Sequence, residues 1–128
     1  MATNYNIDTF RQETLQLAID VNLEATPENP MPMPIDISGS TFYFTVKKSQ
    51  DMLKHNRNAV LKKKWTNQDV PPQVSEIPMG STILNVSSEE MDIPTGVYKY
   101  DIRMEDQYGK VDTICYGKFI VRQNTTEL

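Results

Sequence analysis

The chain has little of what catalysis and cross-linking require. Its 128 residues include one histidine, His55, and one cysteine, Cys115. A single cysteine excludes an intrachain disulfide. The histidine stands between Lys54 and Asn56, a polar setting typical of a solvated imidazole, and the cysteine lies in a predicted strand as a small apolar residue would. No serine or cysteine has the surroundings of an activated nucleophile. The sequence therefore predicts a protein that is not an enzyme.

Long apolar runs, glycine clusters and excess positive charge are also missing. The longest uncharged apolar stretch is far short of the roughly 18 residues of a membrane-spanning helix, and Met1–Tyr5 lacks the basic and apolar regions of a signal peptide. The five glycines are dispersed, so no glycine-rich phosphate loop is present. The formal net charge is −4, whereas nucleic-acid-binding domains are usually basic. We expect no membrane span, no cofactor and no nucleic acid as a partner.

Acidic residues gather around one predicted hairpin without the spacing of a metal-binding loop. A cluster of carboxylates of this kind can bind Ca²⁺, but calcium loops have a fixed spacing that this segment lacks. We interpret the cluster as the solvated face of a hairpin and predict no metal. Its members are Asp101, Glu105, Asp106 and Asp112.

The sequence does contain a repeated alternation of apolar and polar residues. Every second residue is apolar from Leu15 to Leu23, and the same pattern returns in Phe42–Val46 and Tyr98–Met104. A period of two is typical of a strand with one buried face, because successive side chains point to opposite sides. These segments and the last predicted strand supply the expected core: Leu17, Ile19, Val21, Phe42, Phe44, Tyr98, Tyr100 and Phe119.

The whole pattern predicts one all-β domain over residues 1–128. Turns separate about seven or eight short strands, and no long helical period is present, so we expect an antiparallel immunoglobulin-like β-sandwich. The turn Asp106–Gly109 closes a hairpin. Tyr98 or Tyr100, just after Pro94, suits the tyrosine corner of such domains. The additional strands are expected at 5–10, 59–65, 81–86 and 111–122.

A tight turn is predicted before the strand that contains Phe42. Asp36 is expected to accept backbone hydrogen bonds there, since short acidic side chains often do so in turns. Gly39 is expected to have a positive φ, which glycine adopts without steric cost.

Charge is distributed unevenly along the chain. Residues 47–64 have a net charge of about +6 and the remainder about −10. A basic segment and an acidic remainder can attract other copies of the chain or a neighbouring protein. The alternative is a solvated edge strand that its lysines protect. The candidate interface residues in this segment are Lys62, Lys63 and Lys64.

Two further groups of apolar residues are candidates for contact with a partner. Met31 and Met33 lie between prolines in a segment, 26–34, that is expected to be irregular, where they either cover the core or contact another protein. The last strand is expected to have a second apolar face opposite its core face, which is either an interface or covered by residues 66–80. That second face consists of Ile114, Tyr116 and Ile120.

Three motifs resemble the N-terminal domain of phage baseplate upper proteins. The first is the run from Pro34 to Lys48, PIDISGSTFYFTVKK. The second is Gly96–Ile102, GVYKYDI, and the third comprises two glycine-led segments, Gly109–Val111 and Gly117–Val121. The resemblance extends from about Leu15 to Val121, although the glycine that the family often has before its first long strand is absent here.

The resemblance implies a structural protein of a tailed-phage particle. We expect a non-enzymatic module of the tail or baseplate, present in many copies and in contact with other virion proteins, made in the host cytoplasm and located in the virion. A head decoration or head-fibre anchoring protein is the alternative within this class. From another class, a carbohydrate-binding or adhesion module stays open, because tyrosines can stack on sugars. Those tyrosines are Tyr43, Tyr98, Tyr100, Tyr108 and Tyr116.

Overall fold

Strands form all of the regular secondary structure in the described part of the chain. The computed structural model describes residues 3–23, 33–34, 37, 39–48, 59–66 and 81–125. The expected all-β class is confirmed. Three strands have only two residues, which leaves seven longer ones. The strands are β1 (Thr3–Asn4), β2 (Ile7–Phe10), β3 (Leu15–Asp20), β4 (Asn22–Leu23), β5 (Met33–Pro34), β6 (Thr41–Lys48), β7 (Leu61–Trp65), β8 (Ser81–Val86), β9 (Gly96–Glu105) and β10 (Val111–Arg122).

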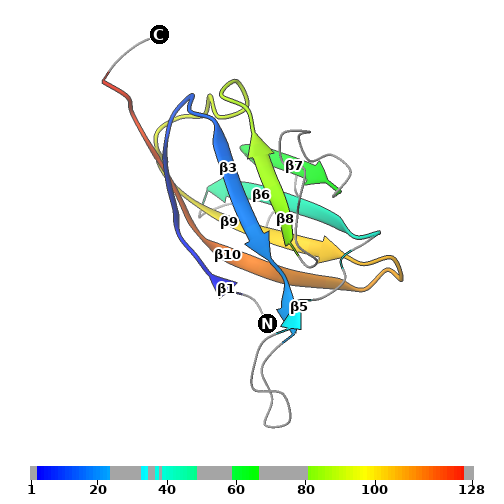
Figure 1. Ribbon diagram of the computed structural model, residues 1–128. Helices are drawn as coiled ribbons and strands as arrows, with labels where there is room; N and C mark the ends of the chain where they lie inside the picture. Colours follow the sequence, from blue (N-terminus) through cyan, green and yellow to red (C-terminus); the bar gives the residue numbers. More distant parts are fainter. Residues whose placement is uncertain are drawn as a thin grey trace.

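Six strands form one large sheet in the order β1-β10-β9-β6-β7, with β2 beside β10 on the same edge as β1 (Figure 1). The pairs β6–β7, β6–β9 and β9–β10 are antiparallel, as predicted. The pairing of β1 and β2 with β10 is parallel, so the expected antiparallel arrangement does not extend to this edge. One edge of β10 is already paired with β9, and the N-terminal segment runs along the other in the same direction as β10.

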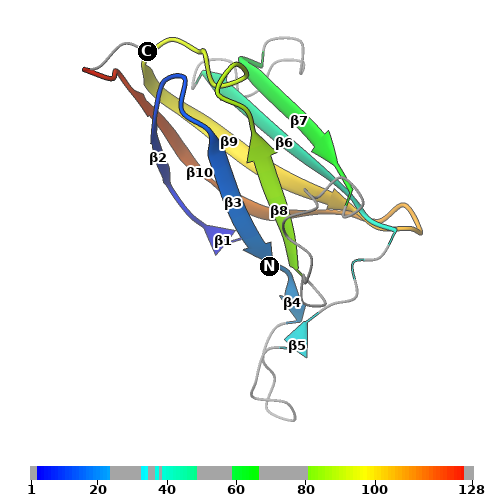
Figure 2. The same ribbon diagram turned by 45° about the horizontal axis from the view of Figure 1, so that its top comes forward.

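A second, smaller layer lies over one face of the large sheet. It consists of β3 and β8, an antiparallel pair that both views place in front of β6, β9 and β10 (Figures 1 and 2). The alternating segment 15–23 is not one strand, because the chain leaves this layer at Val21. Beyond it, β4 pairs with β5 as a separate ribbon. Met33 and Pro34 were expected to be irregular but form β5.

The core lies between the two layers. Phe42, Phe44 and Val46 of β6 are fully buried, whereas the residues between them are half-exposed, as a strand with one buried face requires. The Phe44 ring lies 5.8 Å from the ring of Tyr100 and 5.9 Å from that of Phe119, between ring centroids. Burying a side chain of this size contributes about 1.5–3 kcal/mol.

Seven of the eight predicted core residues are buried. The exception is Leu17, which is only partly buried against the core. Leu17 lies on β3, and both strands of the β3–β8 layer are edge strands, so fewer neighbouring side chains cover it. A hydrogen bond from Trp65 Nε1 to Thr82 Oγ1, 2.8 Å long, connects the large sheet to this layer.

Local chemistry explains the turns. Gly39 has a φ of +76°, which confirms the expected positive φ, while Asp36 lies outside the described residues. Asp106 accepts hydrogen bonds from the backbone N–H groups of Tyr108 and Lys110, both at 2.9 Å, and thereby holds the predicted hairpin turn. The Tyr98 hydroxyl donates to the backbone oxygen of Pro94 at 2.6 Å. Of the two candidates, Tyr98 therefore has the geometry of a tyrosine corner.

Candidate interaction surface

The large sheet has an outer face, turned away from β3 and β8, that consists of the alternate side chains of its strands. Because directly paired residues share a face, the register arranges these side chains in rows across the sheet. One row pairs Ile120 with Val97, and another pairs Lys118, Lys99 and Lys47. The remaining members of the outer face are Asn4, Asp8, Phe10, Thr41, Tyr43, Thr45, Lys62, Lys64, Asp101, Arg103, Glu105, Val111, Thr113, Tyr116 and Arg122.

Three lysines stand directly opposite one another on the outer face, and we call them the lysine row. Lys118 pairs with Lys99, and Lys99 pairs on its other side with Lys47. Like charges at directly opposed positions destabilise a sheet. Sequence reasoning missed Lys99 and Lys118, because each stands between uncharged residues in the sequence and only the strand register brings them together.

Two of the carboxylates of the outer face lie among its cations. Asp101 is half-buried, and the loss of water around it raises the pKa of its carboxyl, although nearby Arg103 and Lys47 act in the opposite direction. Glu105 accepts a long hydrogen bond, 3.4 Å, from the Tyr43 hydroxyl. These groups and their neighbours line an open hollow of about 550 Å³.

The three candidate lysines of β7 do not share one face. Lys62 and Lys64 belong to the outer face, and Lys64 Nζ lies 5.7 Å from the centre of the Tyr43 ring. Lys63 is on the opposite side, since it pairs with buried Phe44, and it forms an ion pair with Glu90 at 2.8 Å. The three candidate interface lysines are therefore divided between the two faces of the sheet.

A bulge in β10 changes the predicted apolar stripe. The register of β10 on β9 shifts between Thr113 and Cys115, so Ile114 is the extra residue and packs partly against the core. Its predicted position beside Tyr116 and Ile120 is wrong. Tyr116 does lie on the outer face and is 44% exposed.

Apolar side chains on the outer face form a small patch. Ile120 is half-buried on the outer face, and its cross-strand partner Val97 is 57% exposed. Of the two candidate methionines, Met31 lies outside the described residues. Met33 is in β5, where it pairs with Leu23.

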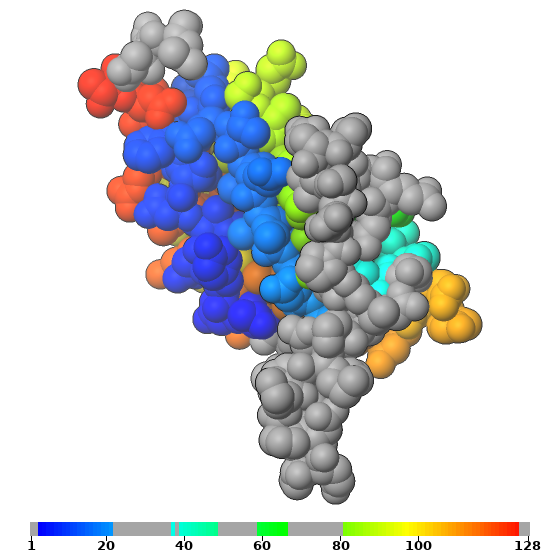
Figure 3. Space-filling model, in the orientation of Figure 1, coloured from blue at the N-terminus to red at the C-terminus, as the bar shows by residue number. Residues whose placement is uncertain are grey.

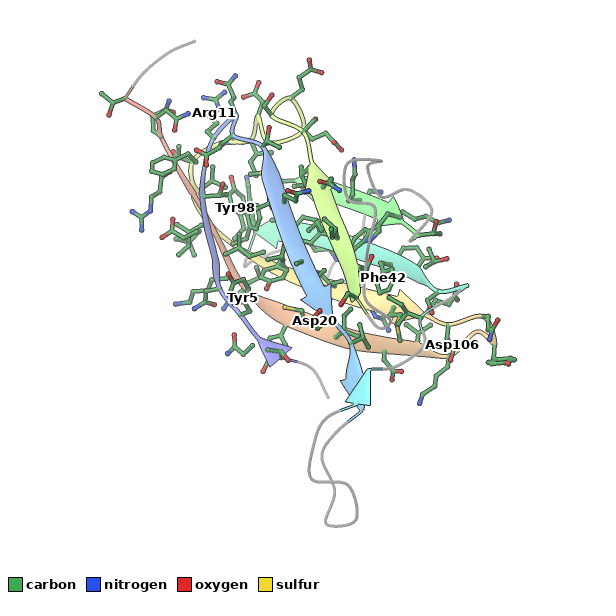
Figure 4. The ribbon with its side chains drawn as sticks, viewed as in Figure 1. Tyr5, Arg11, Asp20, Phe42, Tyr98 and Asp106 are labelled. Carbon is green, nitrogen blue, oxygen red and sulfur yellow. The ribbon has the colours of Figure 1, made fainter. Side chains whose placement is uncertain are left out.

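Two turns meet at one end of the molecule and carry several acidic residues. The backbone N–H of Gln12, between β2 and β3, donates to the oxygen of Met91, between β8 and β9, at 3.0 Å. An ion pair between Arg11 and Asp92, 2.7 Å long, joins the same turns. Figure 4 shows Arg11 at this end, well away from the hairpin with Asp106. We call it the acidic end and define it as Glu13, Glu89, Glu90 and Asp92.

The turn between β8 and β9 is fixed by reciprocal hydrogen bonds. The Glu90 N–H donates to Ser87 Oγ at 3.1 Å, and the Ser87 N–H donates to Glu90 Oε1 at 3.2 Å. This Ser-x-x-Glu arrangement is that of a capping box. The hydrogen bond from Lys63, and then those from Ser87, lower the pKa of Glu90.

The groups most often used in catalysis are not gathered on the described surface. Cys115 is buried, with its sulfur 3.1 Å from the Tyr100 hydroxyl, and burial raises the pKa of Tyr100. His55 lies outside the described residues. Within the described ranges, no three His, Cys, Asp or Glu residues are placed to hold a metal ion together, and no helix has the length and apolarity to span a membrane.

Comparison with known proteins leaves the chain without a match. No protein-family model, no curated protein and no solved structure matches it at a significant level.

Proposed function

We propose that this chain is a non-enzymatic structural module of a tailed-phage particle, in the tail or baseplate, that docks neighbouring subunits. The observation that carries the proposal is the outer face of the large sheet, where the lysine row lies beside exposed Val97 and Tyr116. Opposed like charges lower the stability of a sheet that stands alone, and a partner of opposite charge would offset that cost. The motif resemblance to baseplate upper proteins supports the location in the particle.

We further propose that the fold is an immunoglobulin-like sandwich. The strand order supports this: β2, β10, β9, β6 and β7 correspond to the front sheet A′, G, F, C and C′, and β3 and β8 to strands B and E. Tyr98, at the start of β9, stands where the tyrosine corner lies in such domains. Phe44 and Tyr100 pack together where antibody domains have a tryptophan and a disulfide cysteine.

Two other functions compete with this proposal. A head decoration or head-fibre anchoring protein would use the same sandwich at another place in the particle. A carbohydrate-binding module would use exposed tyrosines, but Tyr98 and Tyr100 are buried in the core. Tyr43 alone of the five lines the 550 Å³ hollow. A glycan array tests that function, and saturable binding that Tyr43→Ala removes would favour it.

The location in a particle is tested on purified phage. We expect tryptic peptides of this chain in the mass spectrum of gradient-purified virions, at a level that corresponds to several copies per particle. Antibody labelling in electron micrographs should then mark the tail or baseplate. Labelling of the capsid would favour the head protein instead, and absence from purified virions would contradict a structural role.

A further inference from the structure

Positive and negative charge are separated between the outer face and the rest of the chain. The outer face has seven cations, Lys47, Lys62, Lys64, Lys99, Arg103, Lys118 and Arg122, and three anions, Asp8, Asp101 and Glu105. Its net charge is therefore +4, and the rest of the chain has −8, since the whole chain has −4. One compact part of that negative remainder is the acidic end.

We infer that the acidic end of one copy of this protein docks on the lysine row of a second copy. The two surfaces are different parts of the molecule, so the contact is head-to-tail and each copy can both receive and donate. Such an interface forms a ring if the rotation between copies closes, and an open chain if it does not. The inference deepens the docking role proposed above and rests on it for its biological setting.

Each of the two surfaces also has a few charges of the opposite sign, and these favour a protein partner over a nucleic acid. Asp101 and Glu105 lie among the cations of the outer face and would repel the phosphates of a polymer that has only negative groups. The acidic end has the matching exception, Arg11, among its carboxylates. A partner with mostly negative and some positive charge therefore fits the outer face, and the acidic end has that composition.

An apolar contact is available next to the lysine row. Val97 is 57% exposed, and it pairs across the strands with Ile120, one row from Lys99. Protein interfaces commonly combine a small apolar centre with charged groups around it. The lysines would orient the approaching copy, and the apolar pair would be covered when contact closes.

The test measures self-association of the purified full chain by sedimentation velocity. We expect concentration-dependent association at about 50 mM NaCl that weakens at about 500 mM, because salt screens exposed charges. Lys99→Glu with Lys118→Glu should weaken association about tenfold or more, and Glu13→Lys with Glu89→Lys should do the same. These pairs reverse the lysine row and the acidic end, respectively.

Mixing the two double variants identifies a head-to-tail contact. Each variant retains the surface that the other has lost, and the two reversed surfaces are also complementary, so the mixture should associate more strongly than either variant alone. A chain with all four substitutions should associate with itself again, because both surfaces are reversed together. The matched control is Lys48→Glu with Lys110→Glu, which changes the net charge equally outside the outer face and should associate like the wild type.

Several results would overturn the inference. Wild-type protein that stays monomeric at low salt at millimolar concentration would do so, and so would a control pair that weakens association as much as the lysine-row pair. A mixture that associates no more than either variant alone would exclude the head-to-tail contact. Circular dichroism and thermal unfolding must show that each variant is folded. This test needs only purified protein, whereas the location test needs purified virions. The prediction of self-association and the prediction of a place in the virion can therefore fail independently.

Discussion

At the scale of single residues, the tyrosine corner depends on one hydroxyl group. We predict that Tyr98→Phe lowers the free energy of unfolding by about 1 kcal/mol, because it removes the hydrogen bond to Pro94 and leaves the ring in place. Urea unfolding measures the change. Tyr116→Phe is the matched control, since its ring is on the outer face, and it should change stability by less than about 0.5 kcal/mol. Equal effects of the two substitutions would show that the corner does not stabilise the fold.

Glu90 gives a pH dependence whose sign follows from its surroundings. The hydrogen bond from Lys63 holds its folded-state pKa below the ordinary value of 4.5, so the unfolded chain takes up the proton first as pH falls. The stabilisation is therefore complete above about pH 5.5 and decreases as pH falls through 4.5 toward the folded-state pKa. The midpoint temperature of thermal unfolding should therefore change less over this pH range for Glu90→Gln than for the wild type.

The control for that prediction is Glu89→Gln at the exposed neighbouring position. Thermal melting between pH 3 and pH 7 compares the three proteins. If wild type and Glu90→Gln lose stability in parallel as the solution is acidified, the ion pair with Lys63 has no role in acid sensitivity.

Residue-scale features with a local cause were predictable. Gly39 stands in a turn that requires a positive φ, and Tyr98 follows a proline–glycine turn, so a few adjacent residues determine both outcomes. The side of the sheet to which Lys63 points was not predictable from a run of three lysines. It depends on the position of buried Leu61 and Trp65 at either end of β7.

At the scale of elements, close approach of the N-terminal segment to β10 requires a glycine. A Cβ atom added at Gly117 would collide with the backbone oxygen of Tyr5. We predict that Gly117→Ala displaces the segment around β1 and speeds hydrogen exchange of the Tyr5 amide, which donates to Tyr116 at 2.8 Å. Amides of the β6–β9 pair should exchange as before. Lys118→Ala, one residue on and exposed, is the control, and equal exchange in both variants would show that β1 tolerates the added atom.

Alternation predicted the strands better than it predicted their continuity. Segments with one apolar face, such as Phe42–Val46, have a register that burial determines, because a shift by one residue would expose the core face. From Val111 to Val121 both faces carry apolar residues, so the pattern does not reveal the bulge before Cys115. The break at Val21, just after β3 ends at Asp20, leaves no mark in the sequence, because the alternation of apolar and polar residues continues through it to Leu23.

At the scale of the whole molecule, the sequence revealed a local excess of positive charge in residues 47–64 but not how charges are arranged in space. The lysines of 47–64 are visible as a run, whereas the lysine row joins Lys47 to residues on β9 and β10. Pairing between distant strands decides which charges become neighbours. Figure 3 shows the residues of β3 on the near face of the molecule, beside the N-terminal segment and the end of β10. The all-β class follows from alternation alone.

The parallel edge of the large sheet has a mechanical consequence. Because β2 and β10 run in the same direction, Ile7 pairs with Phe119 near one end of the shared edge and Phe10 pairs with Arg122 near the other. A force that pulls the two ends of the chain apart therefore slides these strands along each other and loads their hydrogen bonds together, whereas an antiparallel hairpin pulled open at its free ends breaks them one at a time.

This geometry predicts resistance to traction along the chain. In single-molecule pulling, the domain held by its two ends should unfold at a clearly higher force than the same domain held at 97 and 120, which opens the β9–β10 pair from one end. Similar forces in the two directions would show that the parallel edge bears no load. A module built in this way would transmit tension between its neighbours without unzipping.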